Sequence, residues 1–526
     1  MSEEKKIHII GAGLGGLSAA LTLAKKGIPC NLISAQPSER AQSVLAEGGI
    51  NAALDTMGEN DSPAEHMADS LKGGCFLQSE EELKGLTESA PDIVRELCRL
   101  GVPFHAKDGK LILRNFGGQK KKRTAFAKSS TGKIVTTALI DEVRKYEAAG
   151  LVARMPRHEL CGIDTENGSL KSVTVWDRYR DRCFRLTGTV ILCTGGLSGF
   201  FPGCTTGTTQ NTGNAAALAF GAGVEMANLE FLQYHPTTVG ITGKCMLVSE
   251  AARGEGGRLC ILRNGEPWYF MEERYPELKN LMPRDVVARE MTLVRSEPGV
   301  TGSVMLDLTG IPEEVWDRRL SDLREELMSY LPIDPKVTPV PVTPGIHYFM
   351  GGIRVGNSHE TNIRGLYAAG EAACKYHGAN RLGANSMLGA IYGGRVAAEN
   401  AAKTIRESGI CEVPDRPGKS SPVLTEKLKE CLMSGLGILR EESMITAALE
   451  LTDRLMGEAE SELDRKRIRL GQAMLLSALM RKESRGAHTR TDYPGTRDEY
   501  RKLTVAKDEG DRIGITFRSA EESPLG

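Results

Sequence analysis

Residues 7–34 contain the feature that most narrows the folds open to this chain. The apolar stretch "IHII" runs into Gly11, Gly13 and Gly16, and an amphipathic segment then ends at Gly27 before a second apolar stretch, "PCNLIS". This order predicts a strand, a glycine-rich turn, a helix and a second strand, with GxGxxG at the turn. The first glycines allow close approach to a pyrophosphate, and the last lets the helix pack on the strand. The sequence therefore predicts a dinucleotide site, with the phosphates at the helix N-terminus.

The second predicted strand ends at Ser34, at a position where an acidic residue often binds the ribose of a dinucleotide. A hydroxyl group can also hold a ribose, so Ser34 is a candidate cofactor-binding residue. The missing acid disfavours NAD as the cofactor.

The length and composition exclude several classes of protein. At 526 residues the chain is too long for one ordinary core, so two or three domains are expected. Its 67 basic and 68 acidic residues nearly cancel, which removes the electrostatic case for nucleic-acid binding. No apolar run approaches the roughly 18 residues of a membrane span, and the stretch "MSEEKKIHIIGAGLGG" is not expected to be a signal peptide.

The cysteines bear on redox chemistry and location. The chain has 12 cysteines, and none are spaced as CxxC. We therefore expect neither a disulfide framework nor an iron–sulfur cluster or other metal site within this chain. A reducing, cytoplasmic location suits this cysteine usage.

Glycine-rich apolar stretches recur far along the chain. "TVILCTGG" (189–196) ends in paired glycines, and a similar stretch, "GLYAAGEAA" (365–373), contains Glu371. Because these stretches lie so far apart in the chain, we predict one sheet assembled from distant segments.

Two further regions differ from this pattern. Residues 231–345 hold "WYFMEERYPEL" and the proline-rich "PIDPKVTPVPVTPG", which predicts an inserted domain that closes over the cofactor. "DRPGKSSP" (415–422) predicts a linker. Beyond it, Leu424, Leu428 and Leu432 recur at helical spacing and predict a C-terminal helical region.

A set of motifs, in order and spacing, carries a resemblance to a known family. The motifs are "GAGLGGLSAA", "LAEGGINAAL", "LQYHPTT", "SEAARGEGG", "PRDVVARE", "GIHYFMGGI", "LYAAGEAA", "HGANRLGANS" and "ESRGAHTRTDYP". The chain resembles the flavoprotein subunits of the succinate dehydrogenase/fumarate reductase family, which includes L-aspartate oxidase. The resemblance implies an α/β fold in which a Rossmann-like FAD-binding domain (1–230 and 346–414) is interrupted by an α+β capping domain (231–345). A C-terminal helical domain and tail (415–526) would follow.

The resemblance also implies how FAD is held. Gly48 and Gly49 would let the backbone approach the flavin ring, and Gln42 occupies the position where covalent members carry a flavin-linked histidine. Glutamine cannot form that bond, so non-covalent FAD is predicted. The covalent link raises the flavin potential in the family, so its absence should favour fumarate reduction over succinate oxidation. Asn214 stands where the family has an aspartate, and the remaining implied FAD contacts are Ser43, Glu371, Ser386 and Met387.

The implied chemistry reduces a double bond flanked by two carboxylates, with a hydride from flavin N5 and a proton from the protein. By resemblance, Arg381 and His347 hold one carboxylate, and a planar guanidinium suits that role. His235 and Ser249 would hold the other, where the family uses threonine in place of Ser249. The catalytic residues implied are the proton donor Arg284 and its proton relay, Glu250 and Arg253.

Alternative functions remain open at this level. L-aspartate oxidases place a glutamate near the substrate ammonium, at a position occupied here by Phe116 in "RNFGGQ". An apolar ring offers nothing to an ammonium, so fumarate and succinate are favoured over aspartate as substrates. Another activated alkene carboxylic acid is a third possibility, and a flavin-binding scaffold without catalysis is a fourth.

Electrons must come from outside the chain, because no cysteine cluster or haem motif is present. The family's usual partner is an iron–sulfur subunit, and an external electron donor is the alternative. We expect no contact with nucleic acid, and attachment to a membrane only through partner subunits.

Overall fold

The computed structural model of the protein describes residues 5–128, 130–414 and 418–525. Its centre is a five-stranded parallel sheet in the order β22-β12-β1-β2-β8. The strands are β1 (Ile7–Ile10), β2 (Cys30–Ser34), β8 (Val152–Pro156), β12 (Thr189–Leu192) and β22 (Leu366–Ala368). The prediction of one sheet assembled from distant segments is therefore confirmed. Strands β1, β2, β12 and β22 are buried along their whole length, as expected for a parallel sheet covered on both faces.

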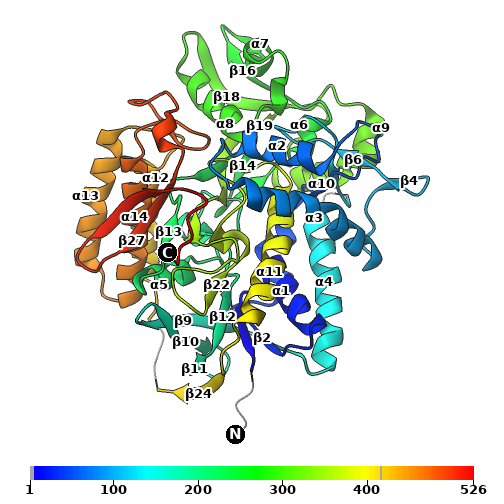
Figure 1. Cartoon of the computed structure of the whole chain (residues 1–526). Helices are drawn as coiled ribbons and strands as arrows, with labels where there is room; N and C mark the ends of the chain where they lie inside the picture. Colours follow the sequence, from blue (N-terminus) through cyan, green and yellow to red (C-terminus); the bar gives the residue numbers. More distant parts are fainter. Residues whose placement is uncertain (1–4, 129, 415–417, 526) are drawn as a thin grey trace.

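Long helices lie beside this sheet (Figure 1). Helix α1 (Leu14–Lys25) follows the glycine turn and packs on α11 (Asn385–Lys403). A Cβ on Gly394 of α11 would lie 2.3 Å from the carbonyl oxygen of Gly15, so the two backbones approach as closely as only glycine allows. The other helices of this region are α2 (Pro63–Gly73), α3 (Glu80–Arg99), α4 (Thr131–Ala148) and α5 (Asn214–Gly221).

Two smaller sheets extend this part of the molecule. An antiparallel sheet of order β24-β11-β10-β9 is formed by β9 (His158–Glu166), β10 (Ser169–Asp177), β11 (Arg182–Thr187) and β24 (Gly409–Val413). Short strands β3 (Ile50–Asn51), β6 (Leu113–Arg114) and β7 (Thr124–Ala125) form another, and β4 (Ala106–Lys107) pairs with β5 (Lys110–Leu111).

The inserted region lies at the top of Figure 1 and has its own apolar core, formed by residues between Val239 and Val342. Strands β14 (Leu232–Ile241) and β20 (Thr343–Phe349) pair antiparallel and lead into and out of it. Leu232 and Ile346 of these strands belong to the neighbouring core. The boundaries 231–345 of the capping domain stay a prediction. Its other elements are β15 (Lys244–Leu247), α6 (Ala251–Gly254), β16 (Arg258–Arg263), β17 (Glu266–Trp268), α7 (Phe270–Arg274), α8 (Arg284–Leu293), β18 (Val300–Asp307), α9 (Glu313–Val315), α10 (Ser321–Tyr330) and β19 (Val340–Pro341).

The C-terminal region, predicted as a helical domain and tail over 415–526, has its α-helices up to Met480, and the segment after them contains strands that the sequence analysis did not predict. Helices α12 (Pro422–Gly435), α13 (Glu442–Glu458) and α14 (Glu462–Met480) are present, with β25 (Leu439–Arg440) and β26 (Thr489–Arg490) nearby. Strands β27 (Leu503–Asp508) and β28 (Ile513–Arg518) then form a hairpin that pairs with β13 (Met226–Ala227). This sheet also contains β21 (Gly352–Arg354) and β23 (Ala373–Cys374), so the end of the chain is built into the FAD-binding region. Part of the predicted linker, 415–417, lies outside the described residues.

A buried ion-pair network fixes this junction. Arg481 contacts Glu230 at 2.6 Å and Glu483 at 3.0 Å, and all three side chains are fully buried. Arg481 also donates to the carbonyl oxygens of Tyr500 and Lys502, both at 2.8 Å. The segment before β14 is thereby tied to the segment before β27.

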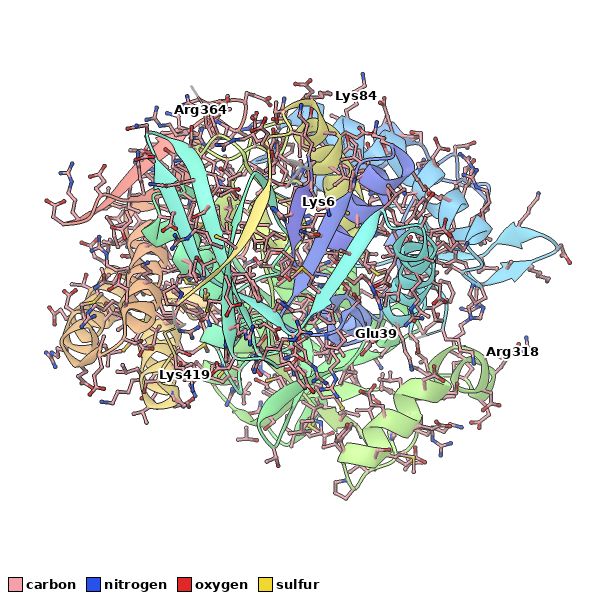
Figure 2. The ribbon with its side chains drawn as sticks, turned by 90° about the horizontal axis from the view of Figure 1, so that it is seen from below. Lys6, Glu39, Lys84, Arg318, Arg364 and Lys419 are labelled. Carbon is pink, nitrogen blue, oxygen red and sulfur yellow. The ribbon has the colours of Figure 1, made fainter. Side chains whose placement is uncertain are left out.

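Seen from below, the C-terminal helices and the inserted region lie on different sides of the central strands, with Arg318 marking the inserted region (Figure 2). The labelled side chains Lys84, Arg318 and Arg364 lie near the outline in this view. Within the described residues, no helix is long and apolar enough to cross a membrane.

Candidate active site

A cavity of about 550 Å³ lies where the carboxyl ends of the parallel strands meet the inserted region. All of the predicted site residues line this cavity except Gly16 and Arg253. Gly16 packs against the turn instead, because a Cβ there would lie 1.8 Å from the carbonyl oxygen of Gly11. Arg253 lies behind the cavity wall and reaches it through Glu250.

One end of the cavity is a backbone cradle that fits the pyrophosphate and ring of the expected FAD. A Cβ on Gly11 would lie 2.1 Å from the carbonyl oxygen of Cys193, so a side chain is excluded there. Gly49 has φ +127°, and a Cβ on it would lie 2.5 Å from the carbonyl oxygen of Ala125. The wall therefore stays bare backbone, as the sequence predicts for a cofactor that approaches closely.

Polar side chains near this cradle have partners that the sequence did not reveal. The Ser43 hydroxyl accepts the amide of Leu14 at 3.1 Å and so caps the first turn of α1. Ser34 donates to the carbonyl oxygen of Gln36 at 2.6 Å. Both residues line the cavity, but their hydroxyl groups are already used in fixing loops.

Gln42 also fixes a loop. Its side-chain oxygen accepts the amide of Thr208 at 2.6 Å, which joins the segment before Gly48 to the loop 203–212. Gln42, predicted from the resemblance to stand in place of a flavin-linked histidine, thus has a hydrogen-bonding role within the protein.

Asn214 begins helix α5 and accepts a hydrogen bond from Arg467 of α14 at 2.7 Å. Its amide group donates to Glu159 at 3.4 Å. Arg467 also stacks on Phe200, with 4.4 Å between the guanidinium and the ring centre. The C-terminal helices therefore support this side of the cavity directly.

Glu371, Ser386 and Met387, predicted to contact FAD, also line the cavity. Glu371 accepts the amide of Phe349 at 3.1 Å. Burial raises the pKa of Glu371 to about 7, although hydrogen bonds and Arg381 act in the opposite direction. Ser386 and Met387 belong to the first turn of α11, which begins after Ala384 in the left-handed conformation, φ +63°.

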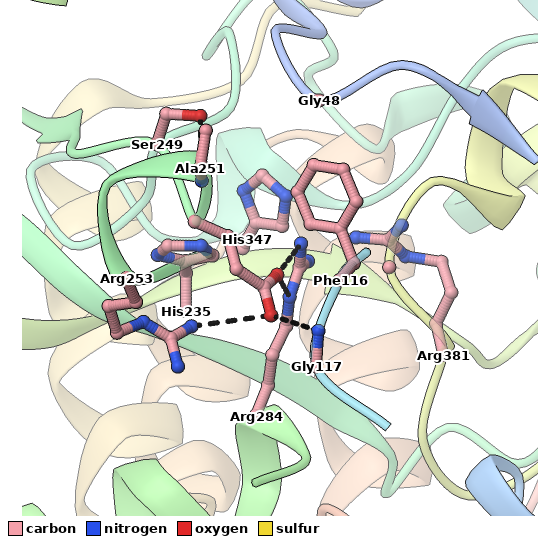
Figure 3. A network of polar contacts seen from close by, with 12 residues as sticks. Gly48, Phe116, Gly117, His235, Ser249, Ala251, Arg253, Arg284, His347 and Arg381 are labelled. Carbon is pink, nitrogen blue, oxygen red and sulfur yellow. Dashed lines mark hydrogen bonds and ion pairs between the residues drawn. The ribbon is translucent and has the colours of Figure 1, made fainter. Parts of the chain in front are cut away.

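The other end of the cavity contains a buried network of three charged residues. Arg284, at the start of α8, donates two hydrogen bonds to one oxygen of Glu250, at 2.9 and 2.7 Å. The second oxygen of Glu250 accepts the amide of Gly117 at 2.8 Å and lies 3.4 Å from Arg253. Figure 3 shows Arg253, Arg284 and Gly117 converging on this carboxylate. The structure thus brings the three predicted catalytic residues together.

The charges in this network are strongly coupled. Burial alone would raise the pKa of Glu250, but the guanidinium groups of Arg284 and Arg253 outweigh it and lower this pKa to about 2. Burial lowers the pKa of Arg253, and Glu250 partly offsets that effect. Glu250 is therefore ionised at neutral pH, and its charge holds Arg284 at the cavity wall.

Arg381 is a buried cation without an anionic partner among the described residues. Its Nε atom is buried without a hydrogen-bond partner, and its guanidinium lies 4.5 Å from the ring centre of Tyr348. Burial, and then the charge of Arg284, lowers the pKa of Arg381 to about 9. A buried charge without a partner is costly, so this geometry indicates a site for an anion.

Two histidines flank the same space, with 5.2 Å between their ring centres. His235 is buried with its Nδ1 against the backbone of Thr237, and its Nε2 has no partner within the described part of the chain. His347 contacts Thr206 through Nδ1 and lines the cavity. Burial, and then the charge of Arg284, lowers the pKa of both imidazoles well below 6.5, so both rings are neutral here.

Phe116 and Ser249 complete the predicted substrate residues. A Cβ on Gly48 would lie 3.2 Å from the Phe116 ring, so this ring covers the predicted flavin wall. The Ser249 hydroxyl accepts the amide of Ala251 at 3.4 Å and is hydrogen-bonded to Glu47.

Sequence reasoning missed Gln233, which lies behind the cavity wall, and Glu47, which lines the cavity. Gln233 accepts from Arg284 at 3.1 Å and donates to the carbonyl oxygen of Arg381 at 2.8 Å, so it links the two arginines. Its position two residues before His235 was an available signal, because alternate residues of a strand share a face. Glu47 carried no such signal. Its pKa is raised to about 8, mainly by burial and to a lesser extent by the charge of Glu326.

The chain is similar to known proteins over most of its length. The family described as FAD binding domain matches residues 7–387, and the family described as fumarate reductase flavoprotein C-term matches residues 464–525. The succinate dehydrogenase flavoprotein subunit of Bacillus subtilis (strain 168) is 36% identical, over 96% of this chain and 94% of that protein. The 8-methylmenaquinol:fumarate reductase flavoprotein subunit of Wolinella succinogenes is 34% identical, over 93% of this chain and 86% of that protein.

A solved structure extends the similarity to the fold. The FrdA chain of a mutant E. coli quinol fumarate reductase superposes with a TM-score of 0.86 at 26% sequence identity. The superposition covers 99% of this chain and 98% of that chain.

Proposed function

Because this chain belongs to the succinate dehydrogenase/fumarate reductase flavoprotein family and is an oxidoreductase acting on CH–CH bonds, like its relatives named above, we propose that it interconverts fumarate and succinate and favours fumarate reduction. The observation that carries the proposal is the buried Arg381, which has no ion-pair partner among the described residues and lines the same cavity as Arg284, itself paired with Glu250. The first group suits a carboxylate and the second suits proton delivery.

The proposed substrate-binding residues form two groups, one for each carboxylate of the substrate. Arg381 and the Nε2 of His347 bind one carboxylate, while His235 and Ser249 bind the other. Phe116 covers the reacting carbons and keeps water out. FAD, when bound, supplies the hydride.

Arg284 delivers the proton to the carbon that does not receive the hydride. An arginine suits this role only if it is held in place and rapidly reprotonated, since its usual pKa is far above neutral. Two hydrogen bonds from Arg284 to Glu250 hold the guanidinium, and Arg253 continues the line of exchangeable protons behind it.

The proposal is tested by reducing the FAD-loaded protein without oxygen, adding fumarate, and following reoxidation of the flavin by absorbance. L-aspartate and oxygen are offered to the oxidised protein in parallel. We expect rapid reoxidation by fumarate and no turnover of aspartate. Turnover of aspartate with no response to fumarate would identify an L-aspartate oxidase instead. No response to fumarate, with reoxidation by another alkene carboxylic acid, would change the substrate.

The FAD is proposed to be non-covalent, because Gln42 has no nucleophilic ring nitrogen to bond to the flavin. Precipitation of the loaded protein in acid should release the flavin into the supernatant. Absorbance of the supernatant near 450 nm measures the release, since oxidised flavins absorb at about that wavelength. Yellow colour retained by the washed pellet would contradict the proposal.

The electron donor is proposed to be an iron–sulfur subunit or another external carrier, since the named relatives are flavoprotein subunits. The protein would then act in the cytoplasm, with any membrane attachment provided by its partners. Reduction of the purified protein by a candidate iron–sulfur protein tests this assignment.

A further inference from the structure

Thr206 is a loop residue that contacts His347, one of the proposed substrate-binding histidines. Its hydroxyl oxygen lies 2.7 Å from the Nδ1 atom of His347. His347 lines the cavity, and Nδ1 is taken by Thr206, so Nε2 is the nitrogen left for a ligand. Because the ring is neutral, it carries one proton, and the position of that proton decides whether Nε2 donates or accepts.

We propose that Thr206 is a positioning residue for the dicarboxylate site, whose hydroxyl donates to Nδ1 of His347 and thereby keeps the ring proton on Nε2. The inference rests on the proposed function, since a carboxylate needs a donor at Nε2. If the proton were on Nδ1, the Nε2 lone pair would face the negatively charged oxygens and repel them. One hydroxyl group therefore selects the tautomer that binds substrate.

The backbone holds Thr206 in this position. Its amide donates to the carbonyl oxygen of Ile346 at 2.9 Å, directly before His347. Two residues further along the loop, the amide of Thr208 donates to Gln42 at 2.6 Å. The loop is thus anchored at Thr206 itself and again two residues beyond it. The distance from Thr206 to His347 is consequently set by paired backbone and not by the side chain alone.

The test compares FAD-loaded wild type with Thr206→Val, which has nearly the same shape without the hydroxyl, and Thr206→Ser, which keeps it. Malonate, a dicarboxylate that cannot be reduced, is titrated by the change in flavin absorbance, and KM and kcat are measured with fumarate. Losing one hydrogen bond of about 1 kcal/mol should raise the malonate Kd and the fumarate KM about five- to tenfold in Thr206→Val. The kcat should fall much less, and Thr206→Ser should restore Kd and KM to within about twofold.

A double-mutant cycle separates this role from a structural one. In a His347→Gln background, Thr206→Val should cause no further rise in Kd, because the hydroxyl acts only through the imidazole. Thr206→Ala supplies a second variant without the hydroxyl if the valine is poorly accommodated. Thr242→Val, in the exposed turn between β14 and β15, controls for loss of a threonine hydroxyl elsewhere.

Each outcome has a distinct meaning. An unchanged Kd in both Thr206→Val and Thr206→Ala, or an equal rise with and without His347, would overturn the inference and leave the proposed function intact. Wild-type protein that binds no malonate and does not respond to fumarate would overturn both.

Discussion

Replacement of Arg284 by alanine should abolish fumarate reduction while the protein still folds, retains its cofactor and binds dicarboxylates. The variant removes the only guanidinium that both lines the cavity and bonds to Glu250 among the described residues. Loss of a positioned proton donor typically costs about 10²–10⁴-fold in rate, and we expect at least about 10³-fold in kcat. Stopped-flow reoxidation of the reduced flavin by fumarate measures this step directly.

The fold should tolerate this change. Glu250 keeps the amide of Gly117 at 2.8 Å and Arg253 at 3.4 Å as partners, so its charge is not left alone. Arg295→Ala, an exposed arginine just beyond α8, is the matched control and should retain the wild-type rate. If Arg284→Ala kept more than about a tenth of the wild-type kcat, Arg284 would not be the proton donor.

Arg381→Met should weaken dicarboxylate binding and, in the ligand-free protein, raise the melting temperature or leave it unchanged. Breaking a buried charge contact by removing one partner costs about 2–5 kcal/mol of binding, so the malonate Kd should rise at least roughly 30-fold. Without substrate, however, the same guanidinium is a buried charge without an ion-pair partner in the described structure, and methionine relieves that penalty.

The pKa of Arg381 fixes the sign of the stability effect. Burial lowers it from its usual range to about 9, so at any pH below about 9 the folded state holds a proton that it binds less tightly than the unfolded chain does. This penalty is fully present at neutral pH and declines only as the pH rises above about 9. Thermal unfolding at pH 7 therefore measures the relief.

A paired buried arginine supplies the control for this experiment. Arg485 contacts Glu483 at 2.7 Å and the carbonyl oxygen of Cys75 at 2.9 Å, so Arg485→Met should lower the melting temperature. Malonate should stabilise the wild type, as any ligand of the folded state does, but not Arg381→Met. A large drop in melting temperature for ligand-free Arg381→Met would show that the guanidinium is structural and not reserved for substrate.

Local patterns in the sequence were enough to predict the parallel sheet. The apolar runs at 7–10 and 189–192 each predict a buried strand, and the glycine turn predicts the connection from the first of them to a helix. The hairpin β27–β28 was missed because its partner, β13, is only two residues long and lies far away in the chain. The local sequence around either strand does not indicate which distant strand it pairs with.

The candidate site was likewise predicted only in part from the sequence. Arg284, Glu250 and Arg381 were named from motifs, and the structure brings them into one cavity. Thr206 was missed because its role depends on a contact with a residue 141 positions away. The use of the Ser43 hydroxyl as a helix cap likewise becomes visible only when the loop meets Leu14 in space. The sequence motifs thus identified the charged groups, whereas the residues that orient these groups could be identified only from the folded structure.

The use of distant strands in the central sheet has a consequence for how the protein is made. Strand β22 and helix α11 close the cofactor cradle, and they end at Lys403 of 526 residues. A chain leaving the ribosome exposes the apolar strands β1, β2 and β12 before their last partner is synthesised. Cofactor capture must therefore wait for β22 and α11, and the nascent chain should depend on chaperones until α11 has emerged.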